Sequence, residues 1–188
     1  LSGYVQHGEP HKAFNCFEQM LCEGIPPDAV TYICILKACG IVKDVDKGKE
    51  IHDEIMRKGM LVTDIVLGNA LVDMYAKCGA LPKARKMLQE LRVRDVVSWN
   101  ALMVGHAQLG QANIVLDLFH KMRAKGVVPD VVTFVAILTA CSHGGLLKEG
   151  EKWFDEMRDL YCLSPVLEHY TCMIDLFGRA GHFIKLEI

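Results

Sequence analysis

Apolar residues recur with a helical period in two successive segments between Val96 and Asp130. The first segment has one apolar face, made of Val96, Val97, Trp99, Leu102, Met103 and Ala107. The second has a similar face made of Val115, Leu118, Phe119 and Met122, with charged residues largely on the other side. Both spacings are typical of amphipathic helices. Gly110 separates the segments and Pro129 cannot continue a helix, so the pattern predicts a helix hairpin of 35 residues.

The hairpin pattern returns along the whole chain. A shift of 102 residues aligns many identical residues, including Asp28 with Asp130 and Gly48 with Gly150. Within this period the hairpins are 36, 31 and 35 residues long. We number the resulting repeats 1 to 6, with repeats 1 and 6 incomplete: 1–28, 29–64, 65–95, 96–130, 131–166 and 167–188.

Hairpins of this size cannot bury their apolar faces alone, so they stack on their neighbours. We therefore expect an all-α fold, a right-handed superhelical solenoid of helix-turn-helix repeats in which residues 1–188 form one array and the first helices line the concave face. The pattern predicts helices over 10–23, 29–39 and 45–58, and a further helix start at Pro82. It also places Phe154, Met157 and Tyr161 in the core.

The repeat register says where the chain begins and ends. Leu1 lies within a first helix and Ile188 early in a second helix, so we expect a part of a longer protein whose targeting peptide lies outside this sequence. Incomplete end repeats should expose apolar faces, which predicts self-association.

Composition narrows the function classes. The formal net charge of −2 argues against binding that rests on phosphate neutralisation alone, although residues 82–94 are locally basic. No apolar run approaches the roughly 20 residues of a membrane-spanning helix. Five of the eight cysteines, at 34, 39, 78, 141 and 172, lie on apolar helix faces, which indicates reduced thiols in a reducing compartment.

The sequence offers no catalytic or metal-binding set. His52-Asp53-Glu54 resembles part of a zinc-deaminase motif, but no Cys-x-x-Cys accompanies it. His7 and His11 are separated by Gly8 and Pro10, which break the helix that would align them. We find no group of nucleophile, base and orienting residue, and we expect neither enzymatic activity nor a metal or cofactor.

Several strings resemble one family. Residues 96–102 read VVSWNAL and residues 68–79 read GNALVDMYAKCG, and the long repeats share Ala38-Cys39 and Ala140-Cys141. These strings resemble plant pentatricopeptide repeat proteins of the subclass in which ordinary, long and short repeats alternate. The resemblance covers the whole chain. Residues 168–181 resemble the last repeats before a C-terminal extension, where any deaminase activity would lie.

The resemblance implies binding of single-stranded RNA, one base per repeat. The fifth and last residues of a repeat would select the base. These positions pair Asn69 with Asp95 and Asn100 with Asp130, both expected to prefer uracil over cytosine, while Thr171 goes with purines and Asp28 has lost its partner. The second residues would form apolar walls around each base: Val30, Val66, Val97 and Val132. The long repeats have Ile33 and Val135 at the selecting position, which leaves their base preference undefined.

The resemblance also implies a cellular role. We expect a specificity module of an organellar RNA editing or processing factor in a mitochondrion or chloroplast, with editing accessory proteins as further partners and no membrane partner. The alternative is a protein-interaction scaffold like the tetratricopeptide solenoids.

Simpler readings of the same residues stay open. Asn69 and Asn100 would then support local helix hydrogen bonds, and the repeated aspartates, Asp64 included, would be helix N-caps. Four residues share one position near the end of a first helix and are either phosphate contacts or solvated helix ends: Gln6, Lys77, Gln108 and Arg179.

Overall fold

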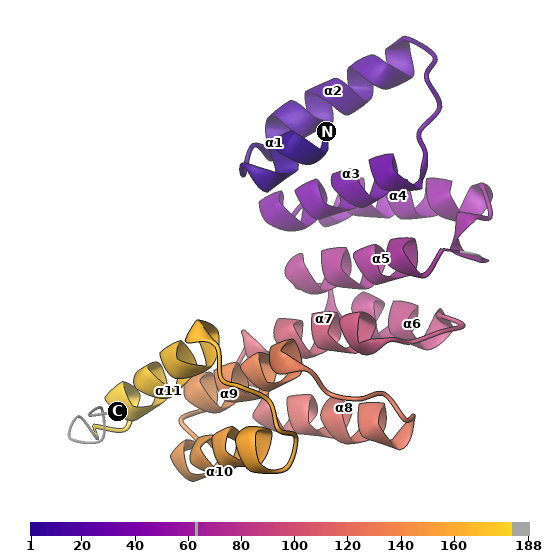
Figure 1. The fold of residues 1–188 in the computed structure, drawn as a ribbon. Coiled ribbons are helices and arrows are strands. Elements are labelled where there is room, and N and C mark those ends of the chain that lie inside the picture. The colour runs from indigo at the N-terminus through magenta and orange to yellow at the C-terminus, as the bar shows by residue number, and fades with distance from the viewer. Residues whose placement is uncertain (63, 182–188) are drawn as a thin grey trace. The chain divides into compact units, whose positions relative to one another are not determined.

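The computed structural model describes residues 1–62 and 64–181, which form α-helices and one short 3₁₀ turn and contain no strand (Figure 1). The helices are α1 (Ser2–Gln6), α2 (Pro10–Cys22), α3 (Ala29–Val42), α4 (Val45–Arg57), α5 (Ile65–Lys77), α6 (Leu81–Glu90), α7 (Val96–Ala107), α8 (Ala112–Ala124), α9 (Val131–Gly144), α10 (Leu147–Asp159) and α11 (Leu167–Arg179), with the 3₁₀ turn η1 at Met60–Val62. The chain divides into an N-terminal half, Leu1–Arg94, and a C-terminal half, Asp95–Ile188.

The N-terminal half stacks the hairpins of repeats 1 to 3. Helix α3 packs between α1 and α5, so the first helices of the three repeats lie side by side. Helices α2 and α4 each pack on the first helix of their own repeat and on that of the next, and α6 packs on α5. Tyr32, Ile35, Leu71 and Met74 are fully buried in this core.

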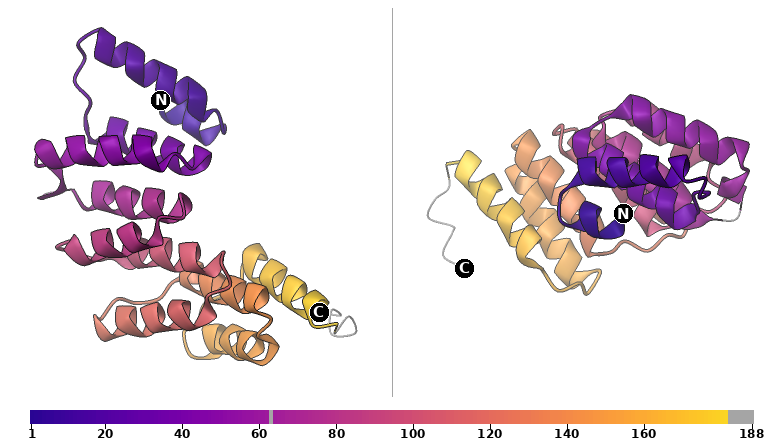
Figure 2. Two further views of the ribbon diagram at one scale, coloured as in Figure 1. Left: turned by 180° about the vertical axis from the view of Figure 1, so that it is seen from behind. Right: turned by 90° about the horizontal axis from the view of Figure 1, so that it is seen from above.

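The C-terminal half repeats this arrangement with α9 packed between α7 and α11, and with α8 and α10 bridging successive first helices. The left view of Figure 2 shows the hairpins layered within each half. Leu102, Phe119, Phe134 and Ile137 are fully buried. The predicted all-α fold of stacked helix hairpins is confirmed.

The aspartates that end the repeats begin the helices that follow. The carboxylates of Asp28, Asp64, Asp95 and Asp130 accept hydrogen bonds from the backbone N–H three residues later, at 2.7, 3.0, 2.9 and 2.9 Å. An N-cap of this kind stabilises a helix by about 1 kcal/mol. The reading of these residues as N-caps is confirmed, and the four caps mark where α3, α5, α7 and α9 start.

Glycines at the hairpin turns adopt left-handed backbone conformations. Gly145 has a φ of 67° after α9, at the turn between the helices of repeat 5. The equivalent turn of repeat 2 has Lys43 at a φ of 59°, a conformation that costs a residue with a Cβ about 1 kcal/mol or more.

Three expectations need correction. Helix α3 runs three residues beyond the predicted Cys39, through Gly40 to Val42. Val97, assigned to a buried face, is 55% exposed. In α10 the core position belongs to Trp153, whose ring centroid lies 5.2 Å from that of Phe119, whereas Phe154 is half-buried. For Val97 and Phe154 the physical reason is that successive side chains of a helix point about 100° apart, so two neighbouring residues cannot both face the core.

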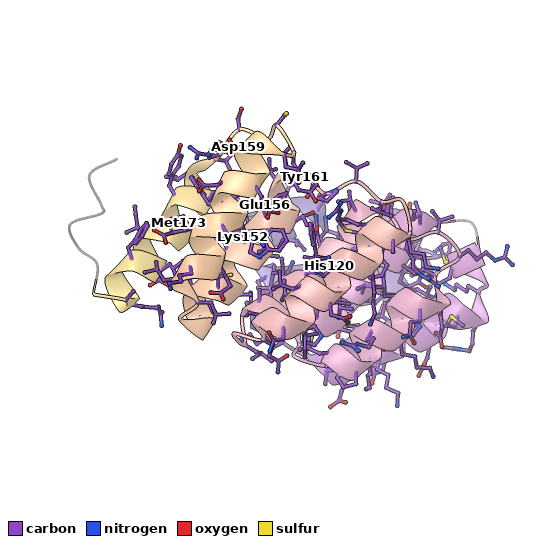
Figure 3. All side chains as sticks on the ribbon, turned by 90° about the horizontal axis from the view of Figure 1, so that it is seen from below. His120, Lys152, Glu156, Asp159, Tyr161 and Met173 are labelled. Atoms are coloured by element: carbon purple, nitrogen blue, oxygen red, sulfur yellow. The ribbon has the colours of Figure 1, made fainter. Side chains whose placement is uncertain are left out.

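The junction of α8 and α10 surrounds this tryptophan with polar side chains. Figure 3 shows His120 on α8, and Lys152 and Glu156 on α10, at this junction. The His120 ring lies 6.5 Å from that of Trp153, and Lys152 lies over the indole at 5.6 Å. Met157 is fully buried as predicted, and Tyr161 packs at 5.0 Å on Phe134 while staying partly exposed.

Candidate nucleic-acid interface

Asn100 and Asp130 meet between two adjacent first helices. Asn100 lies on α7, one turn after the helix start, and Asp130 caps α9, which packs on α7. The Asn100 side-chain amide donates to Asp130 Oδ1 at 2.8 Å, and its carbonyl oxygen accepts from the Thr133 hydroxyl at 2.8 Å. Asn100 is only 5% exposed. The two residues proposed to select a base are therefore in direct contact.

These bonds leave the amide with defined spare capacity. A side-chain amide has two N–H donors and two carbonyl lone pairs, and one of each is used here. One donor and one acceptor remain in one plane. A pyrimidine edge presents the complementary pair, since uracil has an N–H beside a carbonyl oxygen.

Exposed valines lie in the first turns of α7 and α9, the two helices that this polar pair joins. Val97 precedes Asn100 by three residues on α7, and Val132 is in the first turn of α9, next to Thr133. They are 55% and 45% exposed, which is unusual for valine in the first turn of a packed helix. In the N-terminal half, Val30 on α3 and Val66 on α5 are 63% and 56% exposed. Every second-position valine therefore presents apolar surface to solvent.

The α3–α5 step of the N-terminal half has the same frame without the amide. Ile33 takes the place of asparagine on α3 and is half-buried, and Asp64 caps α5. Position 5 of repeat 5 is Val135, also half-buried, and Val166 stands where the other repeats end in aspartate. The long repeats thus keep the apolar walls but lack hydrogen-bonding side chains at the selecting position.

The other predicted base-selecting pair, Asn69 with Asp95, has one residue in each half of the chain. Asn69 is buried in α5 at 7% exposure. Asp95 caps α7, where its backbone carbonyl oxygen accepts from the Ser98 hydroxyl at 2.8 Å. Asp28 caps α3. The hydrogen bond from the Thr31 hydroxyl is the main cause that lowers the pKa of the Asp28 carboxyl, and the bond from the Thr31 backbone N–H adds to it.

The last repeat uses different chemistry. Thr171 is exposed on α11, and its hydroxyl donates to the Leu167 carbonyl oxygen at 3.0 Å. His169, fully buried, replaces the usual cap: its Nδ1 accepts from the Val166 N–H at 3.0 Å and its Nε2 donates to the Val131 carbonyl oxygen at 2.9 Å. These two bonds require the neutral imidazole with its proton on Nε2.

The four candidate phosphate contacts are all exposed, but two of them are charge-paired. Lys77 donates to Asp73 at 2.8 Å and Arg179 donates to Asp175 at 2.9 Å. Asp175 also accepts from the Ser142 hydroxyl, and this bond is the main cause that lowers the pKa of the Asp175 carboxyl. Gln6 and Gln108 carry no charge, and Gln108 is the C-cap residue of α7. An RNA phosphate would have to compete with the two carboxylates.

Sequence reasoning missed Thr133 and His169. The signal for Thr133 is the spacing of Asp-x-x-Thr or Asp-x-x-Ser, which recurs from Asp28, Asp95 and Asp130 and marks a capping sequence. His169 occupies the same place after a valine, and no simple pattern in the sequence marks it.

Other sites in the described residues offer less. All eight cysteines are free thiols, and burial raises the pKa of Cys39 to about 12 and that of Cys141 to about 11. Within residues 1–62 and 64–181 no cluster of histidine, cysteine or carboxylate side chains is arranged to hold a metal, and every helix is too short or too polar to span a bilayer.

A hollow of about 420 Å³ lies between α10 and α11, lined by Glu151, Phe154, Asp155, Arg158, Tyr170, Met173 and Phe177. The equivalent place in the N-terminal half is a smaller hollow of about 190 Å³, lined by α4 and α5 and also by α6. The hollow between α10 and α11 is therefore a recurring feature of the repeat.

The comparisons with solved structures agree with this fold. The chain is similar to the crystal structure of the pentatricopeptide repeat protein PPR10 in complex with an 18-nt psaJ RNA element, with a TM-score of 0.85, 26% identity, and coverage of 97% of this chain and 27% of that one. It also shares its fold with the PPR domain of Arabidopsis thaliana protein-only RNase P 1 in complex with tRNA, with a TM-score of 0.61, 13% identity and 93% coverage of both chains.

Relatives by sequence are Arabidopsis thaliana proteins. The chain is 44% identical to the putative pentatricopeptide repeat-containing protein At3g49142 over 95% of its own length and 26% of the relative's. It is 41% identical to the pentatricopeptide repeat-containing protein At3g22150, chloroplastic, over 96% of its own length and 22% of the relative's. The chain thus spans about a quarter of the length of these relatives.

Family models match most of the chain. A PPR repeat family model matches residues 1–41 and 94–143, and a PPR repeat model matches residues 30–60, 69–96, 132–162 and 168–186. These matches follow the hairpins described above. The chain belongs to the pentatricopeptide (PPR) repeat family.

Proposed function

We propose that this chain is a sequence-specific single-stranded RNA-binding module in which each repeat contacts one base. The observation that carries the proposal is the Asn100–Asp130–Thr133 hydrogen-bond network, which leaves one amide donor and one amide acceptor unused on a pair of helices that each have an exposed valine in the first turn. The solved PPR10 complex with RNA supports it, because that chain has the same fold at 26% identity.

The valines supply the apolar part of the site. A base between Val97 and Val132 would cover side chains that are otherwise 55% and 45% exposed, and its edge would meet the Asn100 amide. Stacking of a base on a protein side chain contributes about 1–3 kcal/mol and tolerates any sequence. The valines would therefore provide affinity and the amide selectivity. This division suits a chain with a net charge of −2.

The repeats would then differ in preference along the RNA. Repeats 3 and 4, with Asn69 and Asn100, take a pyrimidine with uracil preferred. Repeats 2 and 5 accept any base, because Ile33 and Val135 form no hydrogen bonds with a base edge. Repeat 6, with Thr171, takes a purine.

The wider role follows from the alternation of repeat lengths. Repeats of 36, 31 and 35 residues support membership of the subclass with long, short and ordinary repeats. We propose that the chain directs an organellar RNA editing or processing factor. One relative is named chloroplastic, and a mitochondrion stays an equal candidate.

A switch of base preference tests the proposal. The full chain selects RNA from a pool of random single-stranded sequences, and the base aligned with repeat 4 is read from the bound fraction. Asn100→Thr is expected to move that base from uracil toward guanine because Asp130 is retained, and Asn100→Ala is expected to lose the preference. Asn113→Thr makes the same change on the exposed face of α8 and serves as control.

The second candidate function is a protein-interaction scaffold. It is favoured by the exposed apolar side chains of the long repeats, including Val30, Ile41 and Val132 at 63%, 47% and 45% exposure, which suit an editing accessory protein or a second copy of the chain. The same experiment separates the two functions. A bound RNA pool with no base preference at any aligned position, before and after the Asn100 exchange, would leave the scaffold ahead.

A further inference from the structure

Thr133 touches both members of the base-selecting pair. It is fully buried in the first turn of α9. Its Oγ1 lies 2.8 Å from Asn100 Oδ1 and 2.9 Å from Asp130 Oδ1, and it accepts a hydrogen bond from the Asp130 backbone N–H at 3.1 Å. A residue of repeat 5 therefore takes part in the site assigned to repeat 4.

The other hydrogen bonds at this site determine which atom accepts the proton of the Thr133 hydroxyl. Asp130 Oδ1 already accepts the Thr133 backbone N–H at 2.9 Å and the Asn100 amide N–H at 2.8 Å. The hydroxyl proton therefore goes to Asn100 Oδ1. With the donor side of the amide facing Asp130 and the acceptor side facing Thr133, a flipped amide would set its carbonyl oxygen against the carboxylate and its N–H against the hydroxyl proton.

We propose that Thr133 is a positioning residue for base selection: it fixes the Asn100 amide in one orientation before the RNA arrives. This inference rests on the proposed RNA-binding function. An amide held on both sides offers the base one donor and one acceptor at fixed places, whereas an amide held only by Asp130 can tilt and adapt to other base edges. Preorganisation of this kind raises selectivity because the ordering is complete before binding.

The residues at the same place in two other caps direct their hydroxyls only to the capping aspartate. Ser98, three residues after Asp95, directs its hydroxyl to the Asp95 carbonyl oxygen at 2.8 Å. Thr31, three residues after Asp28, directs its hydroxyl to the Asp28 carboxylate at 2.7 Å. Both caps are complete with the backbone N–H alone. The Thr133 hydroxyl belongs to the capping box of α9, where it accepts the Asp130 backbone N–H, and in addition it contacts Asn100 Oδ1.

The experiment measures ratios of dissociation constants. The probes are a single-stranded RNA selected by the unaltered chain and its three derivatives with another base opposite repeat 4. Thr133→Val replaces the hydroxyl by a methyl group of the same size and is expected to reduce the preference for uracil by about threefold to tenfold, the value of one hydrogen bond. Thr133→Ser restores the hydroxyl and is expected to restore the preference.

Two further variants control for folding. Thr139→Val makes the same replacement on α9 away from the site, where the hydroxyl lies 3.3 Å from Cys172 Sγ, and is expected to keep the ratios. Thr133→Ala gives a second measurement without the added methyl group should Thr133→Val disturb the helix. Circular dichroism checks that each variant is helical.

Each outcome decides something. Thr133→Val and Thr133→Ala with weaker binding to all four RNAs and unchanged ratios would overturn the inference, since a merely structural residue lowers affinity without changing preference. An unaltered chain with no preference opposite repeat 4 would overturn the proposed function itself. A preference lost in both hydroxyl-free variants and kept in Thr133→Ser and Thr139→Val would support the inference.

Discussion

Gly150 lies where α10, the second helix of repeat 5, packs against α11, the first helix of the next repeat. A Cβ at this position would overlap Leu176 Cδ2 of α11 and lie 3.5 Å from Cys141 Cβ of α9. Leu176 is 1% exposed and has little room to move. We predict that Gly150→Ala destabilises the C-terminal half although it improves the intrinsic helix propensity of α10.

The magnitude follows from two opposing effects. Alanine in place of glycine inside a helix favours the helix by about 1 kcal/mol. Forcing a methyl group into a packed core costs about 1–3 kcal/mol. Because Leu176 is buried and branched, we expect the upper part of this range and a net loss of about 1–2 kcal/mol, or roughly 2–8 °C in melting temperature for a chain of this size.

Gly178 provides the matched control. It lies in α11 with no atom within 4 Å of a Cβ built on it, so Gly178→Ala should raise the melting temperature slightly. Gly48, the equivalent of Gly150 in repeat 2, meets Met74, whose unbranched side chain adapts more easily, so Gly48→Ala should fall between the two. Thermal unfolding followed by helical circular dichroism measures all three. Equal effects of Gly150→Ala and Gly178→Ala would refute the packing argument.

Two further predictions concern ionisable groups. Burial lowers the pKa of His52 below its usual 6.5, so the unfolded chain binds the proton more readily than the folded chain. The free energy of unfolding is therefore retained above about pH 6.5 and falls as the pH drops below that value. His52→Phe keeps an aromatic ring where the His52 ring packs 5.7 Å from Tyr75, and denaturant titrations should show that it loses less stability than the unaltered chain between about pH 7.5 and about pH 5.5. Burial raises the pKa of Cys141 to about 11, so this thiol should resist iodoacetamide at about pH 8 until the chain unfolds, whereas the exposed Cys162 should react at once. Mass spectrometry that shows equal rates of alkylation at the two cysteines in the folded chain would contradict this prediction.

The sequence located the helices closely where local chemistry decides their ends. Pro10 begins α2, as its place in the first turn predicts, and Asp28 and Asp130 cap α3 and α9. The end of α3 was misplaced because Gly40 is a common local signal for the end of a helix, yet α3 continues through it to Val42. Gly40 lies so close to α5 that a Cβ added to it would be 3.2 Å from Lys77 Cδ.

At the candidate site, too, the sequence identified the residues and the helix packing decided how they meet. Spacing and family strings nominated Asn100 and Asp130, which lie 30 positions apart in the chain. Their contact at 2.8 Å, and the third partner Thr133, depend on α9 packing against α7. No local sequence pattern predicts the distance between the Asn100 amide and the Asp130 carboxylate, because that distance depends on how the side chains between α7 and α9 pack.

By itself, the sequence determined the helical period, the repeat boundaries, the capping aspartates and the family, because each of these depends on residues within one or two helical turns or on comparison at a fixed offset. Tertiary structure alone decided which of two neighbouring apolar residues is buried. Trp153 and Phe154 fit the helical pattern of α10 about equally well, and only the neighbouring rings, Phe119 for one and Tyr170 for the other, place Trp153 in the core. Val97 and Trp99 are both apolar in the first turn of α7, yet packing leaves Val97 at 55% exposure and Trp99 at 6%. Burial depends on what lies opposite, and that is fixed only when the helices stack.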